Sequence, residues 1–152
     1  MEVETHPNGA CCGALVRGID LRELDARTTA ELRALWLRHG VLAFPEQHLS
    51  IEEFEALAGR FGPWGEDPYF RTLPDHPHVA EIRREADEQT PIFAESWHSD
   101  WSFLARPPAM TLLNARVLPP VGGDTLYADQ RVAYQALDDA MKARLDGLMG
   151  IH

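Results

Sequence analysis

The residues best able to carry chemistry are a histidine and an aspartate two positions apart, His98 and Asp100. On a β-strand, residues two apart point to the same face, so an imidazole and a carboxylate would be offered side by side. This pairing suits a divalent metal, and with a distant second histidine it makes the 2-His-1-carboxylate triad of non-haem Fe(II) oxygenases. Such a triad leaves positions open for a chelating 2-oxo acid and for dioxygen. Taken alone, a His-x-Asp pair is more often a half-buried histidine hydrogen-bonded to a nearby aspartate.

The elements that must hold this pair are short strands in the middle of the chain. The residue pattern predicts strands over residues 97–103, 110–117 and 125–127, separated by Pro107-Pro108 and by a tight turn at 119–123. A strand over 97–103 would present the imidazole and the carboxylate on the same side. The prediction of the site therefore depends on the prediction of this strand.

Helices are predicted on both sides of these strands. The other expected elements, in order, are a strand and turn over 14–21, a helix from the capping-box sequence at 28–31 to Gly40, a strand over 41–44, a helix from Ser50 to Gly62-Pro63, a strand over 79–83, a helix starting near Asp129 and a last helix with Met141, Leu145, Leu148 and Met149 on one face. The helix after Ser50 is the best marked, because Ser50 and Glu53 form a capping box. This order indicates an α+β fold with too few strands to close a barrel or a sandwich.

Length and charge narrow the class of protein. The chain has 152 residues, enough for one domain with one core, and a formal net charge of −10. An acidic chain repels phosphate backbones, which argues against binding of nucleic acid through a basic face. No run approaches the roughly twenty apolar residues of a membrane helix, and no apolar signal core opens the chain. The cytoplasm is therefore the expected location. Adjacent Cys11 and Cys12 fit two free thiols in a reducing compartment, with a redox or metal role as the alternative.

The sequence around His98 and Asp100 favours the metal interpretation. The run Trp97-His98-Ser99-Asp100-Trp101-Ser102-Phe103 is followed by Pro107-Pro108 and then by Gly122-Gly123-Asp124-Thr125. In order and spacing, these motifs resemble the taurine and phenoxyalkanoate dioxygenase (TauD/TfdA) family of Fe(II)- and 2-oxoglutarate-dependent oxygenases. The resemblance covers essentially the whole chain, and residues 82–86 look most similar to the phenoxypropionate-type members.

The resemblance implies a fold and an extent. Residues 1–152 would be a single domain, the N-terminal half of a larger catalytic domain. The fold would be the first part of a double-stranded β-helix (jelly roll) with flanking helices and an incomplete barrel.

The resemblance also assigns roles to single residues. His98 and Asp100 match the first two iron ligands, and so the expected catalytic residues. Thr125 matches the hydroxyl that bonds a carboxylate of 2-oxoglutarate, and Gly122-Gly123 match the turn that brings this threonine to the cofactor. Without the resemblance, the same segment is an ordinary hairpin turn with a plain strand threonine.

Several positions depart from the family pattern. Asp67 stands where taurine-binding members carry a histidine that contacts the sulfonate, and a carboxylate there argues against taurine. Trp101 follows the metal-binding aspartate, where members contact substrate through the backbone, but a large tryptophan fits the core equally well. No residue matches the second iron-binding histidine or the arginine that grips 2-oxoglutarate. His152 matches a different histidine.

The implied reaction hydroxylates a small organic acid of the sulfonate, sulfate or aryloxyalkanoate type, consuming dioxygen and releasing succinate and carbon dioxide. The chain would be part of such an enzyme. Two alternatives stand beside this prediction: an inactive remnant acting as a binding or scaffold protein, and a two-ligand metal protein that completes its site across a homo-oligomer. A half-built barrel would expose sheet edges and apolar surface, so the isolated chain is expected to be poorly soluble or oligomeric.

Overall fold

The computed structural model describes residues 1–5, 10–66, 69–91 and 94–151. Helices and short strands alternate in these residues, as expected for an α+β fold. They fall into two compact units, the first made of Met1–His48 and Ala115–His152 and the second of Leu49–Asn114.

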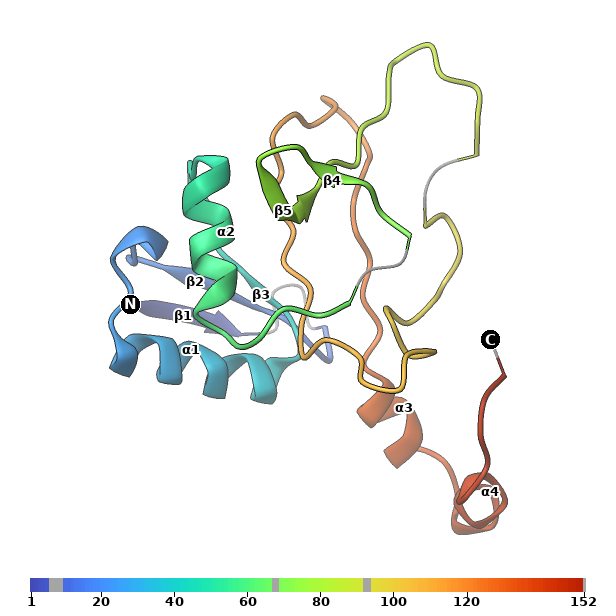
Figure 1. Ribbon diagram of the computed structural model, residues 1–152. Helices are drawn as coiled ribbons and strands as arrows, with labels where there is room; N and C mark the ends of the chain where they lie inside the picture. The colour runs from blue at the N-terminus through green and yellow to red at the C-terminus, as the bar shows by residue number, and fades with distance from the viewer. Residues whose placement is uncertain (6–9, 67–68, 92–93, 152) are drawn as a thin grey trace. The chain divides into compact units, whose positions relative to one another are not determined.

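The first unit is built on a three-stranded sheet of order β1-β2-β3. Strand β1 (Glu2–Thr5) pairs antiparallel with β2 (Ala14–Arg17), and β2 pairs in parallel with β3 (Leu42–Ala43). Helix α1 (Ala26–His39) connects β2 to β3 and lies alongside the sheet (Figure 1). Strand β2 confirms the strand predicted at the start of residues 14–21, whereas β1 was not expected.

The core of the first unit lies between β2 and α1. Ala14 and Val16, two apart on β2, are 3% and 0% exposed, and Leu32 of α1 is 1% exposed. Residues two apart on a strand share one face, so β2 buries this face against the helix. Leu21, in the short 3-10 helix η2 (Leu21–Glu23), and Leu24 complete this apolar set.

The two ends of α1 follow local chemistry. The helix begins two residues before the expected box, because the Asp25 carboxylate accepts from the Thr28 N–H at 2.7 Å and acts as the N-cap. The prediction of the cap at residue 28 was therefore wrong. The predicted end at Gly40 is confirmed: Gly40 has φ 76° and donates its N–H to Trp36.

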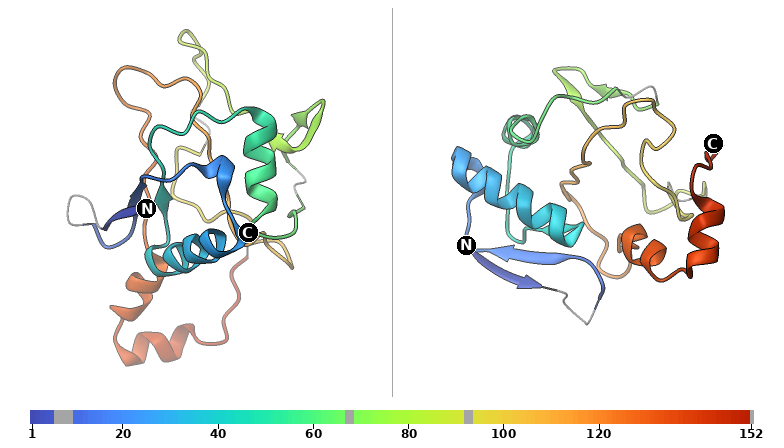
Figure 2. Two further views of the ribbon diagram at one scale, coloured as in Figure 1. Left: turned by 90° about the vertical axis from the view of Figure 1, so that its left-hand side faces the viewer. Right: turned by 90° about the horizontal axis from the view of Figure 1, so that it is seen from below.

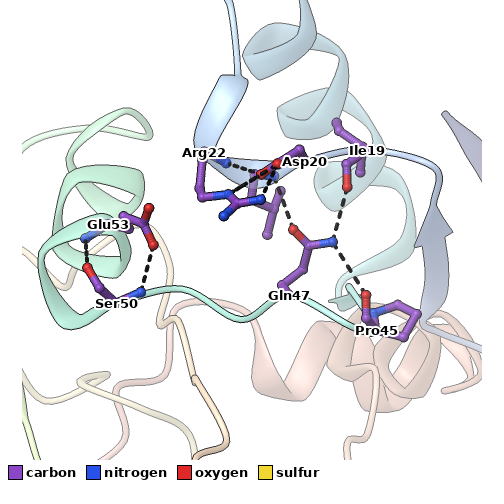
Figure 3. Close-up of polar contacts among 8 residues, drawn as sticks. Ile19, Asp20, Arg22, Pro45, Gln47, Ser50 and Glu53 are labelled. Atoms are coloured by element: carbon purple, nitrogen blue, oxygen red, sulfur yellow. Dashed lines mark hydrogen bonds and ion pairs between the residues drawn. The ribbon is translucent and has the colours of Figure 1, made fainter.

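Gln47 ties the segment after β3 to η2. Its side chain accepts from the Leu21 N–H at 3.1 Å and donates to the Ile19 carbonyl at 3.0 Å (Figure 3). One amide side chain thus satisfies two backbone groups that no strand or helix pairs.

The second unit begins with helix α2 (Ile51–Gly59), and its predicted capping box is confirmed. The Ser50 N–H donates to Glu53 Oε2 at 2.7 Å and the Glu53 N–H donates to Ser50 Oγ at 3.1 Å, as Figure 3 shows. The helix ends at Gly59, before the expected Gly62-Pro63 stop.

A two-stranded hairpin packs on α2 within this unit. Strand β4 (Thr72–Leu73) pairs antiparallel with β5 (His76–Ala80), and β5 contacts α2. The strand predicted over 79–83 thus lies three residues earlier, because the turn at residues 74–75 sets where pairing begins.

The three strands predicted around the candidate site are not formed. Among the described residues, none between 81 and 129 belongs to a helix or strand, and the chain there follows an irregular path (Figure 1, Figure 2). A strand persists only where its N–H and C=O groups find a partner strand, and these extended segments have none. The described residues contain two small sheets and no closed barrel.

Two short helices follow. Helix α3 (Gln130–Gln135) starts directly after its N-cap Asp129, as predicted. Helix α4 (Asp139–Leu145) is shorter than expected, because Gly147 takes φ 75° and leaves Leu148 and Met149 beyond the helix.

Two properties of the surface bear on the predictions. The expected exposure of apolar side chains is present, since Val117, Val121 and Met149 are each about nine-tenths exposed. Within the part of the chain that the structure describes, no helix is long and apolar enough to cross a membrane.

Candidate metal centre

His98 and Asp100 approach each other closely in the second unit. His98 Nε2 lies 3.2 Å from Asp100 Oδ1. The two side chains converge as the spacing suggested, but not on a strand, because residues 97–99 lie outside any strand and residues 100–103 form a turn. The Leu104 N–H donates to the Trp101 carbonyl at 2.9 Å and closes this turn.

The hydrogen bond of the other ring nitrogen decides what His98 offers. Nδ1 lies 2.9 Å from the Ser96 carbonyl oxygen, which can only accept, so Nδ1 carries the proton and donates. In a neutral ring, Nε2 then presents its lone pair to a carboxylate oxygen that is also an acceptor. Two acceptors 3.2 Å apart repel unless a proton or a cation lies between them. This arrangement fits two ligands of a shared divalent cation.

The other oxygen of Asp100 is also held. Thr111 Oγ1 donates to Asp100 Oδ2 at 3.1 Å, which leaves Oδ1 directed to the histidine. Such second partners orient the ligands of metal sites and tune their basicity. The two side chains are 49% and 50% exposed, so further ligands have access to the pair.

The pair supplies only part of a coordination shell. Among the described residues, no three His, Cys, Asp or Glu side chains come together as a group that could hold a metal ion. The imidazole and carboxylate fit two positions of a 2-His-1-carboxylate iron site, whose third ligand is another histidine.

Four aromatic side chains, Tyr69, Phe70, Trp101 and Phe103, form an aromatic cluster around the turn. The Trp101 ring lies 6.0 Å from Phe70 at 76°, 6.1 Å from Phe103 at 56° and 6.5 Å from Tyr69 at 22°. Tyr69 also meets Phe103 edge to face at 5.5 Å. Ring pairs of this kind stabilise by about 0.5–1.5 kcal/mol each beyond their burial.

Trp101 has an unusual backbone. Its φ is 56°, in the left-handed region that glycine favours and that costs an L-residue about 1–2 kcal/mol. Nothing in the sequence signals this conformation, since tryptophan is not a residue typical of left-handed turns. Trp101 is half-buried and does not belong to the buried core, so its exposure decides neither the core alternative nor a substrate contact.

Thr125 and Asp67 are the other candidate residues. Thr125 belongs to the first unit, where it is exposed and outside any helix or strand. Before it, the chain bends at residues 120–121, and Gly122 and Gly123 both take φ 78°. A Cβ on Gly123 would lie 3.0 Å from Pro119 Cγ, so a larger residue there would have to displace the proline ring slightly. Asp67 lies outside the described residues.

The two cysteines are free thiols, as expected. Burial is the main cause that raises the pKa of the Cys12 thiol, with the neighbouring Cys11 as a second cause. A raised pKa disfavours the thiolate that redox and metal chemistry require. This finding supports the interpretation as free thiols over a reactive pair.

Comparison with known proteins decides the family. The sequence model of the family described as "Taurine catabolism dioxygenase TauD, TfdA family" matches residues 4–152. The chain belongs to this family. Enzymes of the family depend on Fe(II) and 2-oxoglutarate, also called alpha-ketoglutarate.

Curated relatives of the chain are named for different substrates. The chain is 35% identical over 150 residues to the (S)-phenoxypropionate/alpha-ketoglutarate-dioxygenase of Sphingobium herbicidovorans. This match covers 96% of this chain and 52% of that protein. The chain is 30% identical to the alpha-ketoglutarate-dependent sulfate ester dioxygenase of Pseudomonas putida, over 100% of this chain and 50% of that protein. The chain thus spans about half the length of these relatives.

Solved structures of the family match the fold. A taurine dioxygenase from Burkholderia xenovorans has a TM-score of 0.83 and 33% identity, over 99% of this chain and 52% of that one. AAD-2 in complex with Mn(II) and N-oxalylglycine has a TM-score of 0.72 and 31% identity, over 96% of this chain and 50% of that one.

Proposed function

We propose that this chain supplies two iron ligands, His98 and Asp100, to an Fe(II)- and 2-oxoglutarate-dependent dioxygenase. The observation that carries the proposal is the 3.2 Å approach of His98 Nε2 to Asp100 Oδ1, two acceptors that need a cation or proton between them. The membership of the chain in the TauD/TfdA family gives this cation the identity of iron.

The chain's own residues hold and orient the cofactors in this proposal. His98 donates through Nδ1 to Ser96, which keeps Nε2 directed to the metal, and Thr111 keeps Asp100 Oδ1 directed there as well. Thr125 donates its hydroxyl to a carboxylate of 2-oxoglutarate. When bound, iron and 2-oxoglutarate supply the oxidising chemistry, in which dioxygen is consumed, succinate and carbon dioxide leave and the substrate gains a hydroxyl.

The substrate class is a small organic acid of the sulfonate, sulfate or aryloxyalkanoate type. Relatives named for a phenoxypropionate and for a sulfate ester support this range. Asp67 and the backbone of Trp101 are the proposed substrate contacts. A carboxylate at Asp67 disfavours taurine itself.

The missing parts of the site are proposed to come from outside these residues. The chain would be the N-terminal portion of one larger catalytic domain with a jelly-roll fold, to which other residues add the second histidine and the 2-oxoglutarate arginine. The half-length match to the relatives supports this view. A cytoplasmic location belongs to the same proposal, because free thiols are typical of a reducing compartment.

A second candidate function is a binding or scaffold protein without catalysis. It is favoured by one observation: among the described residues, no third side chain joins the pair in a metal-binding group.

Anaerobic titration of the whole protein with Fe(II) and 2-oxoglutarate tests the first proposal. The expected result is a saturable visible charge-transfer band that is lost in His98→Ala and Asp100→Ala. His48→Ala is the matched control, since it removes an exposed histidine outside the pair and should keep the band. A band that survives either substitution in the pair would contradict the assigned ligands, and a whole protein without any band would favour the scaffold function.

Titration of residues 1–152 alone separates the remaining alternatives. The absence of a band in this chain, with a band in the whole protein, would place the third ligand outside these residues. A band that depends on His98 and on protein concentration would show a site completed by a second copy of the chain.

A further inference from the structure

We infer that Trp101 is a positioning residue for the metal pair: its ring, held by the aromatic cluster, keeps the turn after Asp100 in the left-handed conformation that returns Thr111 to Asp100 and so holds Asp100 Oδ1 toward His98. The inference rests on the proposed function of that pair. It concerns the indole ring and is separate from any substrate contact of the Trp101 backbone.

The turn at Trp101 determines where the chain goes after the second ligand. At φ 56°, Trp101 reverses the chain, and its carbonyl accepts from the Leu104 N–H at 2.9 Å. Ser99 Oγ donates to Ser102 Oγ at 2.8 Å across the same turn. Because the chain reverses here, Thr111 can return to Asp100 Oδ2 at 3.1 Å. An extended residue at this position would carry the chain away from the pair.

The left-handed conformation requires support. A bulky L-residue at positive φ persists only where surrounding contacts determine it, and such residues gather at functional sites. Trp101 has this support, since Phe70, Phe103 and Tyr69 all place their rings within 6.5 Å of its ring. Two of these rings, Tyr69 and Phe70, come from a segment about thirty residues earlier, so they brace the turn against a different part of the unit.

The indole itself cannot take part in coordination. Its only polar group is an N–H donor, which offers no lone pair to a metal. Its effect on the metal therefore passes through the geometry of its neighbours. Loss of a hydrogen bond to a metal ligand, such as that from Thr111 to Asp100 Oδ2, typically lowers metal affinity by about 10- to 100-fold.

Three substitutions of Trp101 distinguish the contribution of the indole ring from the steric cost of the positive φ. Trp101→Ala removes the ring and keeps the steric cost of positive φ. Trp101→Gly removes the ring but adopts positive φ without that cost. Trp101→Phe keeps an aromatic ring. Trp64→Ala is the matched control, because Trp64 belongs to the same unit and stacks on His78 at 4.0 Å, outside the aromatic cluster.

The first readout is Mn(II) affinity of the whole protein, followed by electron paramagnetic resonance. We expect Trp101→Ala to bind about tenfold more weakly than the wild type. Trp101→Gly should recover part of this loss, while Trp101→Phe and Trp64→Ala should stay near the wild type. Equal affinity of Trp101→Ala and the wild type would overturn the inference. A Trp101→Gly variant as weak as Trp101→Ala would also overturn it, since the ring would then only fill space.

The second readout needs no metal. At one fixed pH, the ¹⁵N shift of His98 Nε2 reports whether the ring still faces Asp100. It is expected to change in Trp101→Ala and to remain near the wild-type value in Trp101→Gly. An unchanged ¹⁵N shift in Trp101→Ala would overturn the inference, whatever the Mn(II) affinity of the wild type. Failure of the wild type to bind Mn(II) through His98 would contradict the proposed function but not this inference.

Discussion

Arg131, at the start of α3, donates a hydrogen bond from Nη1 to the main-chain oxygen of Leu37, 2.6 Å away and 94 positions earlier in the chain. Leu37 lies in the last turn of α1, where carbonyl groups lack partners within the helix and a cation is favoured. The same guanidinium forms an ion pair with Asp129 Oδ2 at 2.8 Å. A Cβ on Gly40 would lie 3.3 Å from Arg131 Nη2, so the glycine that ends α1 also leaves room for this contact.

Arg131→Lys is expected to lower the melting temperature of the protein. A lysine ammonium is a point charge and cannot contact the Leu37 carbonyl and both Asp129 oxygens in the forked geometry of a guanidinium. Thermal unfolding followed by circular dichroism measures the effect. Arg116→Lys, at an exposed position of the same unit, is the control and should melt with the wild type. Equal melting temperatures for both variants would show that the link contributes nothing to stability.

Asp129 makes the same link sensitive to acid. The hydrogen bond from the Arg131 side chain is the main cause that lowers the pKa of Asp129 from 3.8 to about 2, with the N–H groups of Arg131 and Val132 adding to it. A carboxyl with a lowered pKa stabilises the fold above its unfolded value, and this stability is lost as the pH falls through the folded value. The wild type should therefore lose stability between about pH 4 and about pH 2.

Urea unfolding at a series of pH values tests this sign. In Asp129→Asn, the loss of stability between about pH 4 and about pH 2 should be smaller than in the wild type, because the amide does not titrate. Identical slopes for the two proteins in this range would rule out the contribution of Asp129.

Glu55 joins α2 to the hairpin of the second unit. Its Oε2 lies 2.9 Å from His76 Nδ1, and its Oε1 accepts from the His78 N–H at 3.2 Å. The bond to His76 is the main cause that lowers the pKa of Glu55.

Glu55→Ala removes both contacts, so amide hydrogen exchange of residues 72–80 should become faster. Glu52→Ala is the matched control: Glu52 Oε1 is 3.6 Å from His76 Nε2 and its side chain is 73% exposed, so little change is expected. Similar exchange in both variants would argue against a special role for Glu55.

Local chemistry accounts for the parts of the fold that could be predicted. The capping-box residues Ser50 and Glu53 are three residues apart, and Gly40 ends α1 through a hydrogen bond to Trp36, four residues earlier. Such signals act over a few residues and need no knowledge of the rest of the fold. The error in the predicted start of α1 is also local. Asp25, three residues before the expected cap Thr28, caps the helix because its carboxylate is a stronger acceptor than the threonine hydroxyl.

Contacts between distant segments could not be predicted. The Arg131–Leu37 bond joins residues far apart in the sequence, and the left-handed Trp101 depends on rings from another segment. The strands predicted over 97–103, 110–117 and 125–127 failed for a related reason, because a strand requires a partner that its own residues do not supply. His98 and Asp100 lie close together as their spacing indicated, although the strand that was expected to hold them is not formed.

Thr111→Val is expected to weaken metal binding without removing a ligand. The substitution keeps the shape of the side chain but removes the hydroxyl that donates to Asp100 Oδ2 at 3.1 Å. The carboxylate can then rotate, and Oδ1 is no longer held toward His98 Nε2. Loss of such a contact lowers metal affinity by about tenfold or more. Mn(II) titration of the whole protein by calorimetry measures the change, and Thr111→Ser, which keeps the hydroxyl, should bind close to the wild type. If the valine and serine variants bind Mn(II) equally well, the Thr111 hydroxyl does not orient Asp100.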